Sequence, residues 1–218
     1  MRMVTFTSTV VGGLVMLAVS QGGPSLSLTA QDRATEVVQQ LRGLPTSLPV
    51  VARSDGSVDP VELRRTTLYR ELMQLGAEGA RAMAEALREP DVALRRSVAL
   101  ALAVLAGDGF KPPQERLEIR AQLPALIAAL RDEDDSVRAR VAQAIGGIGP
   151  DAAPAVPALV TLLKNTEEGS RNSACIALYG IGAVAEGALP ALRGALADPS
   201  PDVRRFAQRA IEKIEGRP

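Results

Sequence analysis

Apolar and polar positions in the second half of the chain follow a pattern that predicts paired helices. The stretch from Leu123 begins "LPALIAAL" and then breaks at the acidic run "DEDD". The next apolar residues lie on one face of a helix, since their spacing is 4, 3, 1 and 3: Val137, Val141, Ala144, Ile145 and Ile148. Proline suits the first turn of the first helix, and Gly149 with Pro150 ends the second. The pattern therefore predicts a helical hairpin with a polar turn.

This hairpin repeats with a period of 33 residues. The same positions carry the same residue types in three copies: Pro124, Pro157 and Pro190; Arg138, Arg171 and Arg204; Ala144, Ala177 and Ala210; Ile148, Ile181 and Ile214. Another copy precedes them and a partial one precedes that. The predicted repeat domain, 61–218, contains a partial repeat at 61–78, repeats at about 79–107, 123–155, 156–188 and 189–218, and an insertion at 107–122.

A single hairpin cannot bury its own apolar stripe, so neighbouring copies must stack. The chain is therefore predicted to be all-α, a solenoid of stacked hairpins. The last helix is richer in charge than the others and is expected to cap the array. Ser170 replaces the apolar Val137 of the preceding unit, which predicts looser packing in the third unit.

The motif resembles HEAT repeats, and more closely the short bacterial type found in bilin lyases and many exported proteins. The shared features are the Pro-Ala-Leu opening, the Asp-rich turn, the Val-Arg start of the second helix and the Ala-x-x-x-Ile-Gly-x-Ile-Gly close. The resemblance covers roughly 61–218. It implies an α-solenoid whose second helices line the inner curve, and it implies little about activity.

The first 60 residues differ from the repeats. Residues 1–20 have Arg2, an uncharged apolar stretch and small residues before Gln21, which predicts a signal peptide; an uncleaved N-terminal anchor is the alternative. Residues 21–60 are expected to be a flexible leader with one short helix. Asp32 is its candidate cap, and Val37, Val38 and Leu41 form its apolar face.

Composition narrows the chemistry. Lys plus Arg equals Asp plus Glu at 25 each, so there is no basic surplus for nucleic acid. Histidine is absent and Cys175 is the single cysteine, which removes the commonest general base and a zinc site made within one chain. No catalytic, cofactor-binding or metal residues are assigned, and no membrane span is expected in the mature chain.

Three features carry competing interpretations. The acids at 132–135 suit a hard cation but are expected to cap the following helix. Cys175 is expected to be packed, although a nucleophile or a tetrapyrrole attachment point is the alternative. The four repeated arginines are Arg95, Arg138, Arg171 and Arg204; they are expected to pair with acids of the turns, with a binding ladder as the alternative.

The variable positions of the second helices are the candidate protein-binding residues. They are Gln143, Asn172, Ile176, Tyr179, Arg205 and Arg209, with Glu212 in the same phase. The insertion, which carries Phe110, is the competing contact surface. We expect an exported (periplasmic or extracellular), non-enzymatic scaffold that binds a protein through the concave face. A HEAT-like bilin lyase or isomerase is the alternative, and a nucleic-acid binder fits the neutral charge poorly.

Overall fold

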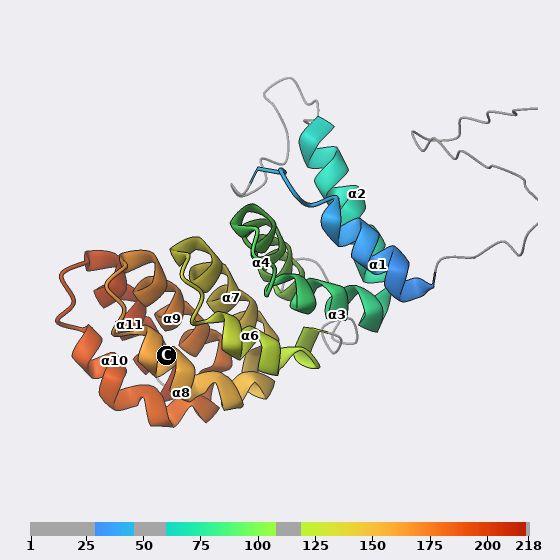
Figure 1. Ribbon diagram of the computed structural model, residues 1–218. Coiled ribbons are helices and arrows are strands. Elements are labelled where there is room, and N and C mark those ends of the chain that lie inside the picture. Colours follow the sequence, from blue (N-terminus) through green and yellow to red (C-terminus); the bar gives the residue numbers. More distant parts are fainter. Residues whose placement is uncertain (1–28, 46–59, 108–118, 217–218) are drawn as a thin grey trace, which may run out of the picture.

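The computed structural model describes residues 29–45, 60–107 and 119–216, with side chains omitted for 60–64. These residues form helices and turns with no strand (Figure 1). The α-helices are α1 (Ala30–Gln39), α2 (Pro60–Gln74), α3 (Gly76–Ala86), α4 (Val92–Ala106), α6 (Leu123–Ala129), α7 (Asp135–Ile148), α8 (Val156–Leu162), α9 (Glu168–Ile181), α10 (Leu189–Ala195) and α11 (Pro201–Ile214). Two 3-10 helices, η1 (Gly149–Ala155) and η2 (Gly182–Ala188), follow α7 and α9. The predicted signal peptide and most of the insertion, including Phe110, lie outside the described residues.

The hairpin pattern is confirmed in the repeats. Each first helix, α6, α8 or α10, has its proline in the first turn, and each is followed by a polar turn and a longer second helix. Gly149 and Gly182 end α7 and α9 with φ of 79° and 72°. This left-handed backbone is strained for residues with a Cβ, so glycine is required where the chain leaves each second helix.

The hairpins stack through their second helices, and the array is an α-solenoid, as predicted. The second helices α4, α7, α9 and α11 pack against one another in sequence order, while α6, α8 and α10 form an outer row against them (Figure 1). Side chains such as Val141, Ile145 and Leu178 are fully buried between the two rows. We refer to the surface formed by α4, α7, α9 and α11 as the second-helix face.

Caps of the second helices follow the sequence in part. Asp91 caps α4, and Asp134 caps α7 by accepting from the Val137 backbone N–H at 3.1 Å. In α9 the N-cap is also an acid, Glu167, but its side chain makes no cap bond. In α11 the cap is a hydroxyl, Ser200, because this short side chain reaches the Val203 N–H.

Two other expectations need correction. In α1 the N-cap is Thr29 and not Asp32. Asp32 lies three residues later and completes a capping box, because its carboxylate accepts from the Thr29 N–H at 3.1 Å. The predicted apolar face of Val37, Val38 and Leu41 is buried.

Ser170 is fully buried and does not leave a loose site, because its hydroxyl accepts from Arg138 at 3.0 Å and donates to Asp135 at 2.6 Å.

Two stretches of the described chain, Asp135–Leu162 and Glu168–Ala195, are long and apolar enough to be considered as membrane spans. Each of them consists of a second helix, a 3-10 helix and the next first helix. Each is broken at Gly149 or Gly182, and the α-helix before the break has 14 residues. Such a helix is about 21 Å long, less than the roughly 30 Å of a bilayer core. Both stretches are therefore accounted for as core helices of the solenoid.

Candidate functional site

Close packing between second helices depends on glycines near their C-terminal ends. A Cβ on Gly147 would lie 2.4 Å from the Ala106 carbonyl oxygen of α4, and one on Gly180 would lie 2.4 Å from the Gly146 oxygen of α7. One repeat later, the equivalent position carries Lys213. In the α4–α7 and α7–α9 pairs, a Cβ at this position would collide with the backbone of the preceding second helix. Because Lys213 has a Cβ, α11 cannot pack as closely on α9.

At this last junction, aromatic and cationic side chains occupy the place of the glycines. Tyr179 of α9 stands where α7 has Gly146, and this residue is 38% exposed. The Arg209 guanidinium lies 5.6 Å from the Tyr179 ring centroid and 5.9 Å from that of Phe206. Arg205 lies 4.9 Å from the Phe206 ring, and the Lys213 ammonium lies 6.0 Å from the Tyr179 ring. We call these five residues the Tyr179 cluster.

The cluster has an excess of positive charge. Arg205 pairs with Asp202 at 3.0 Å, but both side chains are more than half exposed, so the pair is weak. Arg209 and Lys213 have no ion-pair partner among the described residues, and the nearby Glu212 accepts a hydrogen bond from Gln208 at 2.7 Å. The cluster thus presents rigid aromatic surface beside unpaired cations, a combination enriched in protein-binding sites.

The structure divides the six candidate residues into two groups. Tyr179, Arg205 and Arg209 come together in the cluster. Gln143, Asn172 and Ile176 are half-buried and take no part in the cation–ring contacts of the cluster. The Gln143 amide donates to Ser173 of the next repeat at 3.4 Å, so it also helps to join α7 to α9. The Asn172 Oδ1 is buried without a hydrogen-bond partner.

Phe206 and Lys213 belong to the cluster but were not among the predicted site residues. Phe206 occupies the position of Arg140 and Ser173 in earlier repeats, and Lys213 occupies that of Gly147 and Gly180. The replacement of a repeated glycine by lysine was the available signal. Its meaning depended on knowing that this glycine touches the neighbouring helix.

Three of the four repeated arginines pair with acids of the turns, as expected from the sequence, whereas Arg204 donates only to backbone carbonyls among the described residues. Arg95 binds Asp132 of the following repeat through both Nε (2.9 Å) and Nη2 (3.2 Å). Arg171 binds Asp198 in the same way, at 2.7 and 3.0 Å. The hydrogen bond from Arg171 lowers the pKa of the Asp198 carboxyl, and burial opposes this effect. These pairs join successive repeats.

The acids at 132–135 are likewise occupied within the fold. Asp134 receives the Arg96 guanidinium at 2.5 Å besides capping α7, and this hydrogen bond lowers the pKa of the Asp134 carboxyl. Asp135 accepts from Ser170 and Arg138. Among the described residues, no three His, Cys, Asp or Glu side chains are grouped so as to hold a metal ion.

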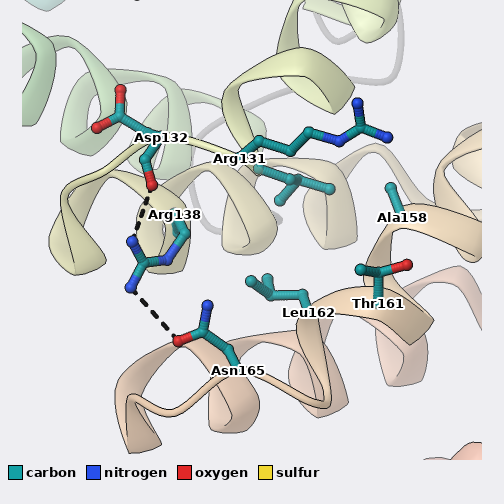
Figure 2. Close-up of a pocket in the computed structure, with 8 residues that line it drawn as sticks. Arg131, Asp132, Arg138, Ala158, Thr161, Leu162 and Asn165 are labelled. Atoms are coloured by element: carbon teal, nitrogen blue, oxygen red, sulfur yellow. Dashed lines mark hydrogen bonds between the residues drawn. The ribbon is translucent and has the colours of Figure 1, made fainter.

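A small hollow of about 200 Å³ lies between the α6–α7 turn and α8 (Figure 2). Its lining includes Arg131, Thr161 and the buried Arg138. All five N–H donors of Arg138 are engaged: Nε by Ser170, Nη1 by the carbonyls of Asp132 and Glu133, and Nη2 by Asp135 and by Asn165 at 3.5 Å. The guanidinium therefore has no donor left for a ligand in this hollow.

Cys175 is fully buried in α9. Burial raises the pKa of its thiol to about 12, so the thiol is protonated at neutral pH. Since the thiolate is the reactive form, this environment fits the packed role and disfavours a nucleophile or an attachment point.

Comparisons with known proteins agree with this architecture. Two family models match the chain, one for HEAT repeats over residues 123–212 and one for HEAT-like repeats over residues 92–148. No curated protein matches the sequence significantly.

Several solved structures share the fold at low sequence identity. A designed armadillo repeat protein in complex with the peptide (KR)4 is 19% identical, with a TM-score of 0.57, over 83% of this chain and 81% of that one. Computationally designed armadillo repeat proteins for modular peptide recognition give 22% identity and a TM-score of 0.56 over 85% and 83%. The complex of CpcE and CpcF of phycocyanin lyase from Nostoc sp. PCC7120 gives 17% and 0.56 over 81% and 96%.

Proposed function

We propose that this chain, which is a HEAT-repeat protein over residues 92–212, is an exported, non-enzymatic scaffold that binds a protein partner along its second-helix face. The observation that carries the proposal is the Tyr179 cluster. Tyr179 and the three cations are exposed on α9 and α11, and Tyr179 and Lys213 stand where earlier repeats have glycine. We take this face to be the concave one, as the resemblance implies.

An extended partner suits this surface better than a small substrate. The cluster is open and projects from two helices, whereas the hollow beside α8 has about 200 Å³ and its buried guanidinium is fully bonded. Peptide binding by the designed armadillo neighbours shows that the architecture is compatible with such a partner. Export is supported by the pattern of residues 1–20 alone.

The test is capture of partners from the native cell envelope by the wild-type chain and by the Arg205→Glu/Arg209→Glu variant. The matched control is Arg131→Glu/Lys164→Glu, which changes the net charge equally at two exposed positions of the first-helix row. We expect the same partner with the wild type and the control, and its loss with the cluster variant.

Binding that survives charge reversal in the cluster but is lost with the control would move the site to the first-helix row. Failure of the folded wild-type chain to retain any protein would contradict the scaffold function. Fractionation of the expressing cells tests export separately, because a cytoplasmic, full-length product is incompatible with it.

A bilin lyase or isomerase is the second candidate, and the observation behind it is the shared fold with the phycocyanin lyase complex. At 17% identity this likeness extends to the fold alone. The protonated, buried Cys175 weighs against an attachment role. Incubation of the purified chain with a tetrapyrrole, followed by absorbance spectroscopy, would reveal bound pigment if this candidate is correct.

A further inference from the structure

The arginines that join the repeats are held in one recurring geometry. In Arg95, Nη1 donates to the carbonyls of Glu89 and Pro90 in its own turn, both at 3.0 Å. In Arg171, Nη1 donates to the carbonyls of Asn165 and Thr166 at 3.1 and 2.7 Å. The other edge of each guanidinium, formed by Nε and Nη2, then points to the following repeat and binds its aspartate.

Arg204 has the same attachment to its own turn, and the described residues contain no repeat after it. Its Nη1 donates to the carbonyls of Asp198 and Pro199 at 2.6 and 2.9 Å. Its Nε and Nη2 have no hydrogen-bond partner in the described part of the chain. Both oxygens of the Asp198 carboxylate accept from Arg171, and Arg204 makes no side-chain hydrogen bond to this carboxylate.

We propose that Arg204 is a carboxylate-binding site, and that it anchors an acidic segment of the protein partner beside α11. Two backbone carbonyls orient the guanidinium before binding, so a carboxylate meets a preformed pair of donors. Arg95 and Arg171 show within the same molecule what this edge binds. The inference rests on the proposed function and adds the chemistry of the partner.

The surroundings of Arg204 favour an acidic peptide. Arg205, Arg209 and Lys213 follow on the same helix, and among the described residues only Arg205 of these three has an ion-pair partner, the exposed Asp202. A nucleic acid is disfavoured because the whole chain has zero net charge, whereas binding to phosphate backbones is driven by a basic surplus.

The first experiment follows the arginine Nε–H resonances of the full 218-residue chain by NMR. In the free protein, the Nε–H of Arg204 should exchange rapidly with water, while those of Arg95, Arg138 and Arg171 are protected by their hydrogen bonds. Addition of a peptide of about ten residues rich in Asp and Glu should slow the exchange of Arg204 alone. The peptide with Asn and Gln in place of the acids should have no effect.

Variants provide the second measurement. Arg204→Lys keeps the charge but loses the two-donor edge, and should weaken binding of the acidic peptide about tenfold. Arg131→Lys, the matched control, should leave it unchanged. Arg205→Gln/Arg209→Gln, which retains Arg204, should weaken binding and increase its dependence on Arg204. Thermal unfolding of each variant shows whether it is folded.

The inference is overturned if the acidic peptide leaves the Arg204 resonance unmoved, if Arg204→Lys binds it as well as the wild type, or if a single-stranded oligonucleotide displaces it. Capture of a partner from the cell envelope without any binding of the acidic peptide would overturn this inference and leave the scaffold function standing. Loss of capture by the wild type would instead contradict the scaffold function itself.

Discussion

Substitution of Gly180 by alanine tests the way in which the repeats pack. Gly180 is the penultimate residue of α9, and its α-carbon faces the backbone of α7. A Cβ there would lie 2.4 Å from the Gly146 oxygen and 2.9 Å from its carbonyl carbon. Ordinary contact requires about 3.5 Å, so α7 and α9 would have to separate by about 1 Å.

The expected cost follows from two opposing effects. Overpacking a close interface costs about 1–3 kcal/mol, and the upper end applies here because the obstructing atoms are backbone atoms that cannot rotate away. Alanine also gains up to about 1 kcal/mol over glycine in a helix. The net loss for Gly180→Ala should be about 2 kcal/mol.

Gly194→Ala is the matched control. Gly194 is the penultimate residue of α10, and a Cβ there would have nothing within 4 Å. The same change should therefore stabilise the chain by about 0.4–1 kcal/mol. Urea unfolding followed by far-UV circular dichroism measures both variants, with the slopes compared because repeat arrays can depart from two-state unfolding.

The order of the two midpoints decides the outcome. The packing geometry requires Gly180→Ala to unfold at lower urea than the wild type, and Gly194→Ala at the same or higher urea. Equal or higher stability of Gly180→Ala would mean that the second helices do not approach each other at this glycine. The explanation for the Tyr179 cluster would then fail as well.

Three further outcomes are expected from the described contacts. Ile145→Ala, at a fully buried position, should cost about 2–5 kcal/mol in urea unfolding, and an unchanged midpoint would refute the assigned core face. The lowered pKa of Asp198 means that its pairing with Arg171 stabilises the fold above the unfolded carboxyl pKa of about 4, and that this contribution is lost as the pH falls through the lower folded pKa. Asp198→Asn should remove that part of the acid dependence, and midpoints recorded from neutral to acidic pH will show whether it does. Cys175, with a thiol pKa of about 12, should resist iodoacetamide in the native chain and react after unfolding, as measured by mass spectrometry; rapid native labelling would contradict its burial.

The 33-residue period was sufficient to predict the helices of the repeats, because the residues that start and end a helix are selected by the local backbone conformation. Pro124, Pro157 and Pro190 mark first turns, and Gly149 and Gly182 mark helix ends, since each choice depends on the backbone of its own residue. Caps were harder to predict because several side chains in one turn can reach the same N–H. Thr29 in α1 and Ser200 in α11 fill that role, although acids stand close by.

The candidate site was predicted only in part. Helical phase placed Tyr179, Arg205 and Arg209 on one surface, but it placed Gln143, Asn172 and Ile176 there equally. Helical phase shows which residues of one helix share a face. It does not show which residues of that face are covered by a neighbouring helix. Phe206 and Lys213 joined the cluster because α9 and α11 lie side by side, which no single helix reveals.

The sequence by itself determined that this protein is a stack of helical hairpins, since a period of 33 residues with apolar stripes leaves stacking as the way to bury them. Only the tertiary structure decided how each repeated arginine is used. Arg95, Arg138, Arg171 and Arg204 are equivalent in sequence, yet three of them are bonded to the next repeat and the fourth is not. The physical reason is that Arg95, Arg138 and Arg171 each face the turn of a following repeat, whereas the described residues hold no such turn beyond Arg204.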